Sequence, residues 1–311
     1  MLLSLIVPCC NEEDNVGLFF SEMQRAFEER SEQLEFVFID DGSSDATFAR
    51  LKSIYDENPR ARIQIISFSR NFGKEAAMYA GMKNAKGDLV CIIDADRQQR
   101  PEALINMLDV LENDDNIDCV AAYQQKRKEN AFFSLSKSLF YKIINRLSDV
   151  EFFDGASDFR LMRRNVLDSV LSLTEKSRFS KGIFSFVGFN TEYVPYTAAP
   201  RERGKSKWSY FKLLRYALGG IISFSTKPLR FSFFFGALSF ISAIVCALFA
   251  ISPGAETYSD TVFLVALFVL GGIILISLGI IGAYLSTLYT EIKNRPVYII
   301  KTHIGRDIEN G

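Results

Sequence analysis

Two long stretches without a charged residue constrain this chain more than any other feature of its sequence. They run from Phe231 to Ile251 and from Thr261 to Tyr289. Each is long enough to cross the hydrocarbon core of a bilayer, which needs about 20 apolar residues. The alternative is a buried hairpin in the core of a soluble protein. We favour two membrane-spanning helices, and the high phenylalanine content toward the C-terminal half also points to lipid.

The charges around these stretches predict their orientation. The connector at 252–260 contains no Lys or Arg, whereas Lys227 and Arg230 precede the first stretch and Lys293 and Arg295 follow the second. Positively charged flanks are retained on the cytoplasmic side of a membrane. We therefore expect a multi-pass protein of the inner or plasma membrane, with both termini and the remaining domain in the cytoplasm.

Composition excludes several kinds of chemistry. The net charge of −1 gives no reason to expect binding to nucleic acid. The single histidine, His303, leaves no room for a Ser-His-Asp triad, a histidine-bearing zinc site or a histidine general base elsewhere. The five cysteines lack metal-type spacing and suggest reduced thiols in a cytosolic protein. Any chemistry of this chain must therefore use carboxylates and basic groups, with or without a bound metal ion.

The first 122 residues alternate between two kinds of segment. Short apolar runs at 3–8, 35–40, 62–68, 88–94 and 117–122 have strand character, and the segments at 14–30, 45–56, 74–85 and 101–112 have helical spacing. This order predicts an α/β domain with a mostly parallel sheet and helices on both faces.

Polar residues follow the first four predicted strands. They include Asn11 and Glu12, the run Asp40-Asp41-Gly42-Ser43-Ser44-Asp45, the run Ser69-Arg70-Asn71-Phe72-Gly73-Lys74, and the pair Asp94 and Asp96. Helix capping could explain any one of these groups. Four groups at the same edge of a parallel sheet instead predict a ligand crevice there.

The residue types favour a nucleotide-diphosphate donor. Glu12 and Asp40 could accept hydrogen bonds from a base or ribose, and Asp94 and Asp96 could hold Mg²⁺ or Mn²⁺ beside a diphosphate. The alternative for the last pair is to cap a helix that begins at Pro101. Neither a GxGxxG nor a GxxxxGK[ST] motif is present.

These motifs resemble those of family 2 glycosyltransferases with the Rossmann-like GT-A fold. The residues concerned are Val7-Pro8-Cys9-Cys10-Asn11-Glu12-Glu13, Asp40-Asp41-Gly42-Ser43-Ser44-Asp45 and Asp94-Ala95-Asp96-Arg97-Gln98. The runs Ser69 to Glu75 and Ser157 to Met162 are similar to the polyprenyl-phosphate branch, which includes bactoprenol glucosyltransferases and dolichol-phosphate mannose synthases. Arg97 and Arg100 depart from the family pattern and add positive charge beside the expected metal site.

The resemblance implies a role for each candidate residue. It assigns the metal to Asp96 and Gln98, with Asp94 as a further or outer ligand. Nucleotide-sugar binding is expected of Pro8, Asn11, Glu12, Asp40, Lys74 and Asp94. Asp96 and Asp158 are the expected catalytic residues. Asp158 would position groups or assist as a base, and its alternative is a salt bridge with Arg160. Arg160, Arg203, Ser206 and Lys207 are expected to bind the acceptor or the diphosphate, the last three from a basic loop at 201–208.

The expected organisation has three parts. Residues 1–226 form the cytosolic GT-A domain, including amphipathic helices at about 131–147 and 208–226 that lie on the membrane surface; a core helix is the alternative for the first. Residues 227–290 contain the two spanning helices, and 291–311 form a cytosolic tail. Gly271, Gly272, Gly279 and Gly282 permit close helix packing. Such packing is compatible with a homo-oligomer such as a tetramer. A flippase is a further candidate partner.

The resulting prediction is an inverting transferase that moves a hexose from a nucleotide-diphosphate sugar to undecaprenyl or another polyprenyl phosphate. UDP-glucose is the first choice of donor, with UDP-N-acetylhexosamine, a UDP-modified arabinose and GDP-mannose as alternatives. The product would supply sugar for cell-envelope glycans such as the O-antigen of lipopolysaccharide. A processive synthase lacks support because no QxxRW-type motif is present. A non-catalytic nucleotide-sugar-binding or flippase-partner protein is the remaining alternative.

Overall fold

The computed structural model of the chain describes residues 1–124, 145–146, 148, 153, 155–199, 219–250 and 259–305. The chain divides into two compact units. The first comprises Met1–Tyr141, Glu151–Trp208 and Arg295–Gly311, and the second comprises Lys142–Val150 and Ser209–Asn294.

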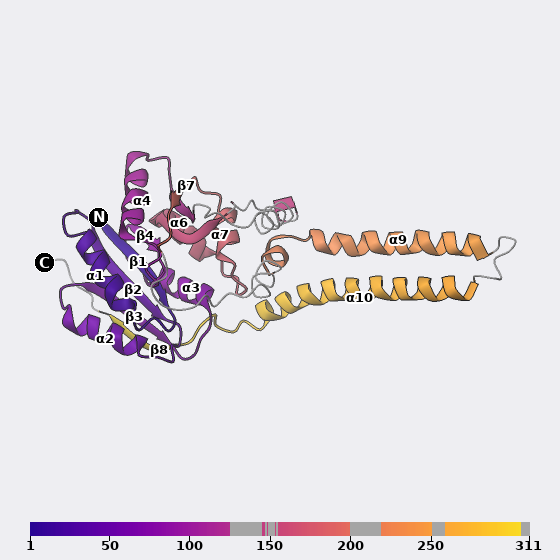
Figure 1. The fold of residues 1–311 in the computed structure, drawn as a ribbon, viewed down its shortest axis with the longest axis horizontal. Helices are drawn as coiled ribbons and strands as arrows, with labels where there is room; N and C mark the ends of the chain where they lie inside the picture. Colours follow the sequence, from indigo (N-terminus) through magenta and orange to yellow (C-terminus); the bar gives the residue numbers. More distant parts are fainter. Residues whose placement is uncertain are drawn as a thin grey trace. The chain divides into compact units, whose positions relative to one another are not determined.

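The first unit is built on an eight-stranded sheet with the order β7-β5-β6-β4-β1-β2-β3-β8 (Figure 1). The strands are β1 (Leu2–Cys9), β2 (Gln33–Asp40), β3 (Arg62–Phe68), β4 (Leu89–Ile92), β5 (Cys119–Gln124), β6 (Ala156–Arg163), β7 (Thr191–Tyr196) and β8 (Ile300–Gly305). Strands β4, β1, β2 and β3 are mutually parallel, as are β5 and β7. The predicted α/β class and mostly parallel sheet are confirmed.

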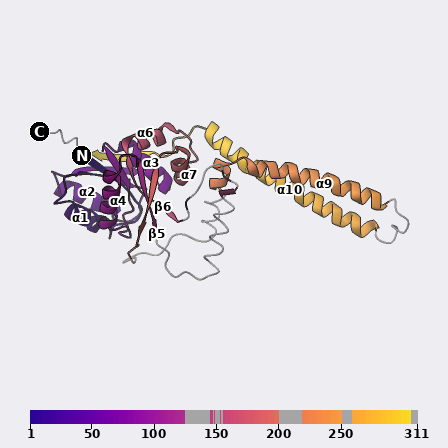
Figure 2. The same cartoon turned by 90° about the horizontal axis from the view of Figure 1, so that it is seen from above.

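Helices cover both faces of the sheet. They are α1 (Val16–Ala26), α2 (Thr47–Glu57), α3 (Lys74–Asn84), α4 (Pro101–Asn113), α6 (Arg164–Ser172) and α7 (Ser180–Phe186). Figure 2 shows α1, α2 and α4 on one side of the strands and α3, α6 and α7 on the other. The alternation of side chains along a strand explains this arrangement. Phe36 and Phe38 of β2 pack in the core with α1, whereas Val37 and Ile39 pack with alanines of α3.

Two strands run against the parallel direction, which the sequence pattern did not predict. Strand β6 lies antiparallel between β4 and β5, with Ile92 paired to Arg160. This register brings residues 94 and 158, two positions further on, to the same level of the sheet. Strand order depends on contacts between distant segments, so the periodicity of each segment alone could not reveal it.

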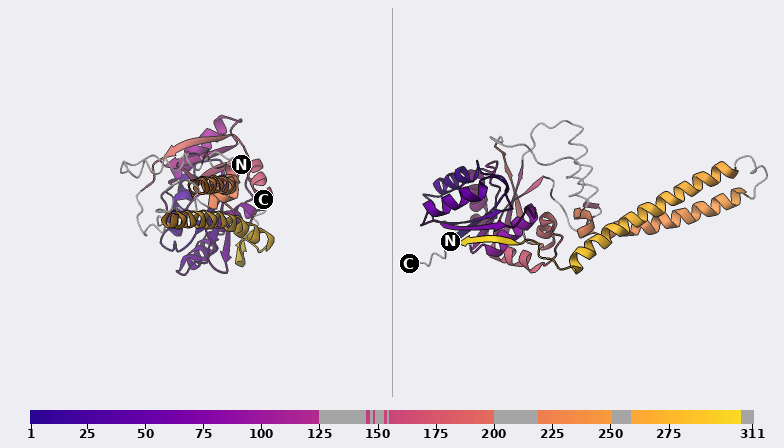
Figure 3. Two further views of the ribbon diagram at one scale, coloured as in Figure 1. Left: turned by 90° about the vertical axis from the view of Figure 1, so that its right-hand side faces the viewer. Right: turned by 90° about the horizontal axis from the view of Figure 1, so that it is seen from below.

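The second antiparallel strand comes from the segment expected to be a cytosolic tail. Residues 300–305 form β8, which pairs with β3 at the edge of the sheet, as Figure 3 shows in its right panel. Tyr298, just before β8, stacks on Phe68 with ring centroids 4.9 Å apart. The chain from Arg295 onward therefore belongs to the first unit, and β8 extends the sheet of that unit.

The second unit contains the two apolar helices. Helices α9 (Lys227–Ala250) and α10 (Ser259–Ile292) lie side by side and antiparallel (Figure 1). Both have the length and composition to cross a membrane, and the apolar side chains point outward. Phe233 and Phe268 are 83% and 78% exposed, which does not suit the core of a soluble protein. The buried-hairpin alternative therefore finds no support in these helices.

Some expectations fall on segments that are not described. These are nearly all of the expected helix at 131–147, the loop at 201–208 and the first half of the expected helix at 208–226.

Candidate active site

The segments that follow β1 and β2 are joined to one another by side chains. Asn11 accepts a hydrogen bond at Oδ1 from the backbone N–H of Ser44 (2.8 Å), and the backbone N–H of Glu12 donates to Thr47 Oγ1 (2.8 Å). Glu12 Oε2 in turn accepts from Asn15 Nδ2 (2.7 Å). Pro8 lies within β1, paired with Ile39. Asn11, Glu12 and Pro8 thus stand at the same edge of the sheet, as predicted.

Asp40 and Asp41, at the end of β2, have different hydrogen-bond partners. Asp40 is buried and accepts hydrogen bonds from Ser67 Oγ (2.7 Å) and the backbone N–H of Ser43 (3.1 Å). Asp41 accepts from the backbone N–H groups of Phe72 (2.6 Å) and Gly73 (3.0 Å), where α3 begins. Burial raises the pKa of Asp41, against the lowering effect of these two N–H donors. Asp41 therefore fixes the entry to α3, and with it the position of Lys74.

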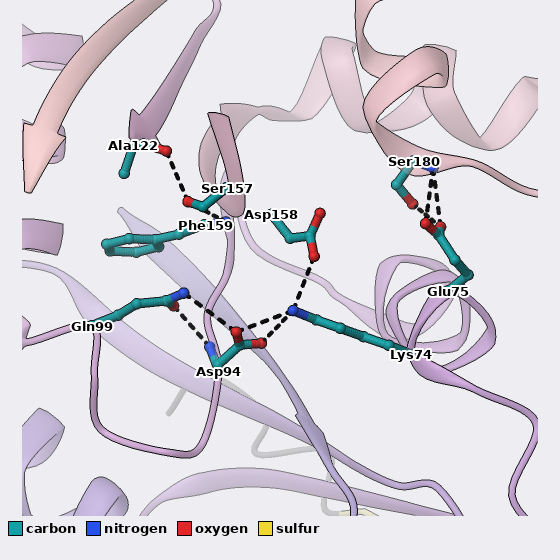
Figure 4. Close-up of polar contacts among 9 residues, drawn as sticks. All are labelled: Lys74, Glu75, Asp94, Gln99, Ala122, Ser157, Asp158, Phe159 and Ser180. Carbon is teal, nitrogen blue, oxygen red and sulfur yellow. Dashed lines mark hydrogen bonds and ion pairs between the residues drawn. The ribbon is translucent and has the colours of Figure 1, made fainter. Parts of the chain in front are cut away.

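Lys74 joins the ends of two strands at the centre of the site (Figure 4). Its Nζ lies 2.8 Å from Asp94 Oδ1 and 3.0 Å from Asp158 Oδ2. Asp94 follows β4, and Asp158 lies on β6, at the level set by the antiparallel register. One ammonium group is thus shared by two carboxylates that are more than 60 residues apart in the chain.

The charge balance keeps Asp158 ionised. Burial alone would raise the pKa of Asp158, but Lys74 and Lys181 lower it to about 2. The second oxygen, Oδ1, is buried and has no hydrogen-bond partner among the described residues. Buried carboxylate oxygens are normally paired, so this oxygen is a candidate for contact with a ligand. Asp158 forms its ion pair with Lys74. The predicted alternative partner, Arg160, instead places its guanidinium 4.4 Å above the centre of the Phe184 ring.

Asp94 has a different environment from Asp158. Gln99, which is buried, accepts a hydrogen bond from the Asp94 backbone N–H (2.9 Å) and donates to Asp94 Oδ2 (3.4 Å). Burial raises the pKa of Asp94, and the neighbouring Asp158 and Asp96 add to this effect while Lys74 opposes it. The Asp94 side chain is 31% exposed, so its desolvation is incomplete. Gln99, rather than Gln98, is the amide that contacts Asp94; sequence reasoning missed it.

Asp96 and Gln98 lie in the turn that follows. Asp96 Oδ1 accepts a hydrogen bond from the backbone N–H of Gln98 (3.1 Å). The Gln98 side chain donates a hydrogen bond through Nε2 to the backbone carbonyl of Ala199 (3.2 Å). The backbone N–H of Ala199 in turn donates to the backbone carbonyl of Gln98 (3.0 Å). This pairing holds the turn against the residues that follow β7.

The two arginines of this segment do not point their charge at the expected metal site. Arg97 pairs with Glu22 of α1 through Nε, at 3.1 and 3.2 Å from the two carboxylate oxygens. Arg100 Nη1 lies 3.6 Å from Glu22 Oε1. Both arginines thus face the same acid on α1, which compensates one of their two positive charges and which no sequence motif revealed.

Glu75, next to Lys74, connects α3 to α7. Its carboxylate accepts hydrogen bonds from the backbone N–H of Ser180 (3.0 and 3.2 Å) and from the Ser180 hydroxyl (Figure 4). This contact places Lys181, the next residue, among the charges around Asp158. Burial lowers the pKa of Lys181, with Arg160 and Lys74 adding to the effect and Asp158 opposing it. Neither Ser180 nor Lys181 stood out in the sequence.

The oxygen donors suit a hard divalent cation only in part. No group of three or more His, Cys, Asp or Glu side chains in the described part of the chain could hold a metal by itself. Mg²⁺ is commonly held by one or two carboxylates together with substrate phosphates and water. Asp96, with the amide oxygen of Gln98 and with Asp94 nearby, fits that kind of incomplete site.

Sequence comparison places the chain in a family. The family model described as glycosyl transferase family 2 matches residues 4–171, which contain β1 to β6 and all the acids described above. The chain belongs to glycosyl transferase family 2. It is a glycosyltransferase enzyme, and the resemblance seen in the motifs is confirmed.

Relatives of this family 2 glycosyltransferase match along nearly the whole chain. It is 38% identical to the putative glycosyltransferase CsbB of Bacillus subtilis, over 96% of this chain and 91% of that protein. It is 36% identical to the SfII prophage-derived bactoprenol glucosyl transferase of Shigella flexneri, over 98% and 99% of the two chains. Among solved structures, a mannosyltransferase from Pyrobaculum calidifontis in complex with GDP-Man and Mn²⁺ is 18% identical, with a TM-score of 0.47 over 94% and 86% of the chains.

The structure thus gathers most of the candidate residues of this glycosyltransferase at one edge of its sheet. Asp94, Asp158 and Lys74 are in direct contact, and Asp96 and Gln98 lie in the adjoining turn. Arg203, Ser206 and Lys207 lie outside the described residues. Gln99, Glu75 and Glu22 support the site but were missed, because their importance depends on tertiary partners. The position of Glu75 directly after Lys74 was the one available signal.

Proposed function

We propose that this protein transfers a hexose, with glucose from UDP-glucose as the first choice, to a polyprenyl phosphate such as undecaprenyl phosphate. The observation on which this proposal depends is Asp158, an ionised, half-buried carboxylate that faces Asp94 across Lys74 and has a buried oxygen without a partner among the described residues. Full-length relatives named bactoprenol glucosyl transferase support the choice of sugar and lipid carrier.

The reaction would be a single displacement with inversion. An oxygen of the acceptor phosphate forms a bond to the anomeric carbon, while the bond from that carbon to the diphosphate breaks and its electron pair leaves with the nucleotide diphosphate. A phosphate monoester has a second pKa of about 6, so the attacking oxygen is already mostly ionised at neutral pH. A strong general base is therefore not needed.

This chemistry favours a positioning role for Asp158. A carboxylate with a pKa of about 2 has little affinity for a proton at neutral pH, so it would be a weak base. Its fixed negative charge can instead orient Lys74 and stabilise positive charge that develops on the sugar ring in the transition state. Lys74 and Arg160 would supply the positive charge that faces the phosphates.

A divalent metal ion, Mg²⁺ or Mn²⁺, fits this proposal. Asp96 and Gln98 would hold it, with Asp94 beside them, and the donor diphosphate would complete its coordination. When bound, the ion would neutralise charge on the departing diphosphate. Asp40, Glu12, Asn11 and Pro8 would contact the nucleoside from the opposite loops.

The two apolar helices fit an acceptor that lies in a membrane. We propose that α9 and α10 anchor the protein in the inner or plasma membrane, with the first unit and both termini on the cytoplasmic side, where nucleotide sugars are available. The absence of Lys and Arg from the connector at 252–260 supports this orientation.

The test is direct transfer in membranes. Membranes that contain the protein are incubated with labelled UDP-glucose, UDP-N-acetylglucosamine or GDP-mannose and undecaprenyl phosphate, with Mg²⁺, with Mn²⁺ or with a chelator. We expect label in the lipid fraction from UDP-glucose, loss of labelling with the chelator, and no labelling by the D158N variant. Absence of lipid labelling from every donor and metal combination would rule the proposal out.

A further inference from the structure

Arg97 has a backbone conformation that is unusual for its residue type. Its φ is +60°, in the left-handed region. Among the described residues, the other non-glycine residues with positive φ are Asn11 and Asn294. Asparagine tolerates this conformation because its short side chain can bond to the nearby backbone, whereas arginine has no such local compensation. Contacts outside its own turn are therefore expected to hold Arg97 in place.

One such contact is the ion pair with Glu22. The guanidinium Nε lies 3.1 Å from Oε1 and 3.2 Å from Oε2, and Nη2 makes a further contact with Oε1 at 2.5 Å. The Arg97 side chain is 12% exposed and that of Glu22 is 28% exposed, so the pair is largely shielded from water. Such a bidentate pair has defined geometry and ties residue 97 to α1.

The conformation of Arg97 determines how its two neighbours are presented. Asp96 Oδ1 accepts a hydrogen bond from the backbone N–H of Gln98, two residues further on. This bond closes a turn with Arg97 at its centre. The Gln98 amide nitrogen is turned toward the Ala199 carbonyl, so its oxygen is directed elsewhere. The carboxylate of Asp96 and the amide oxygen of Gln98 are thus oriented by a turn that depends on a left-handed residue 97.

The ion pair also has an electrostatic consequence. An uncompensated guanidinium beside Asp96 would repel a divalent cation. Glu22 both neutralises this charge and draws the guanidinium toward α1. Replacing Glu22 alone should therefore harm a cation site more than replacing Arg97 alone.

We propose that the Arg97–Glu22 ion pair positions Asp96 and Gln98 to bind a divalent cation together with a nucleoside diphosphate. The proposal takes this cation and diphosphate from the proposed function, and it makes Arg97 and Glu22 positioning residues rather than ligands. It explains why a bulky, charged residue stands at the centre of the acidic turn.

The test measures Mn²⁺ binding directly rather than through turnover. Full-length protein in detergent is titrated with Mn²⁺ in the presence of UDP, and free Mn²⁺ is followed by electron paramagnetic resonance. Loss of residues that orient metal ligands commonly weakens metal binding by about 10- to 100-fold. We expect R97A to weaken Mn²⁺ binding roughly tenfold, and E22A to weaken it more, since the guanidinium then remains but loses the acid that faces it.

Two further variants separate the contribution of the backbone from that of charge. R97G should bind Mn²⁺ more tightly than R97A, because glycine adopts the left-handed conformation without steric cost. The double variant R97A/E22A should bind Mn²⁺ no more weakly than E22A, because the charge of Arg97 is absent while Arg100, which also lies near Glu22, is the same in both variants. R164A, which removes an exposed ion pair with Asp168 on α6, is the matched control and should bind Mn²⁺ like the wild type.

The outcomes are distinct. The inference is overturned by R97A and E22A variants that bind Mn²⁺ within twofold of the wild type, or by a wild-type protein that transfers sugar without binding Mn²⁺. A wild type that binds Mn²⁺, with the expected losses in the variants but no sugar transfer to lipid, would support the inference and contradict the proposed function. If R97A does not fold, E22Q and R97G decide the question in the same titration.

Discussion

The ammonium group of Lys74 lies 3.0 Å from a carboxylate oxygen of Asp158 while it also contacts Asp94 at 2.8 Å. One cation is thus shared by two acids, one that follows β4 and one that lies on β6. Burial lowers the pKa of Lys74, but the two carboxylates more than offset this effect and raise it, so the lysine stays charged throughout the physiological range. Lys74 is therefore a common partner of both acids, while Gln99 also holds Asp94.

Replacing Lys74 should therefore disable transfer more than it disables folding. In K74M the two carboxylates face each other without a shared cation, which raises the pKa of Asp158 and allows both acids to move. We expect the rate of sugar transfer to fall by about 100-fold, the size of effect typical when one electrostatic contact with a reacting group is lost. Labelled-lipid formation in membranes measures this rate.

The matched control lies on the same helix. Lys83 of α3 is exposed and lies 4.8 Å above the ring of Tyr79, away from the acids. K83M should keep transfer close to that of the wild type, and K74R should restore part of the activity lost in K74M. Transfer by K74M within threefold of the wild type would show that the lysine is not required.

The lowered pKa of Asp158 predicts a pH dependence of stability. Its pKa in the folded protein is about 2, below the ordinary value of 3.8, so the folded state binds this proton less readily than the unfolded state. The stabilisation by ionised Asp158 is complete above about pH 5 and is lost as the pH falls from about 4 toward 2. Urea midpoints of the wild type and D158N, measured from pH 7 down to pH 3, should converge at the acid end.

An exposed acid provides the comparison for this titration. Asp168 is 60% exposed and pairs with Arg164 at the protein surface. D168N should differ little from the wild type at any pH, because exposed pairs contribute little to stability. A constant difference between wild type and D158N from pH 7 to pH 3 would contradict the pKa assigned to Asp158.

Gly42 should not tolerate a side chain. Its φ is +61°, and a Cβ atom built there would lie 2.3 Å from the backbone carbon of Arg70 and 2.5 Å from the backbone nitrogen of Asn71. The loops after β2 and β3 therefore approach each other too closely for alanine. We expect G42A to lower the free energy of unfolding by about 2 kcal/mol or more, from backbone strain and the displaced loop. Chemical denaturation measures this change.

A second glycine serves as the control for Gly42. Gly17 in α1 has nothing within 4 Å of an added Cβ and no positive φ. G17A should therefore be neutral or stabilising, by up to about 1 kcal/mol, because alanine favours a helix more than glycine does. A G42A protein as stable as the wild type would show that the two loops can separate without cost.

The contact between Tyr298 and Phe68 should stabilise the sheet edge. Removing the ring in Y298A eliminates the stacked pair at the end of β3 and an edge contact with Tyr79. We expect a loss of about 2 kcal/mol, less than that for a fully buried aromatic residue because Tyr298 is half-buried. The Y298F variant keeps the ring and should stay within about 0.5 kcal/mol of the wild type. Equal unfolding midpoints for Y298A and wild type would contradict a stabilising role for the segment before β8.

The sequence by itself determined the layered α/β class, the two apolar helices and most of the candidate acids. These features are local: alternation of apolar residues defines a strand, a long uncharged run defines a helix suited to lipid, and polar residues at the ends of parallel strands must gather at one edge. Asp40, Asp94 and Asp96 could be found this way without knowledge of their partners.

Only the tertiary structure decided which groups meet. The antiparallel direction of β6 brought Asp158 level with Asp94, and the entry to α3 placed Lys74 between them. The same holds for Glu22 beside Arg97 and for β8 beside β3. Pairing across distant segments depends on strand order, strand direction and the packing of whole helices, and none of these is encoded in the periodicity of a single segment.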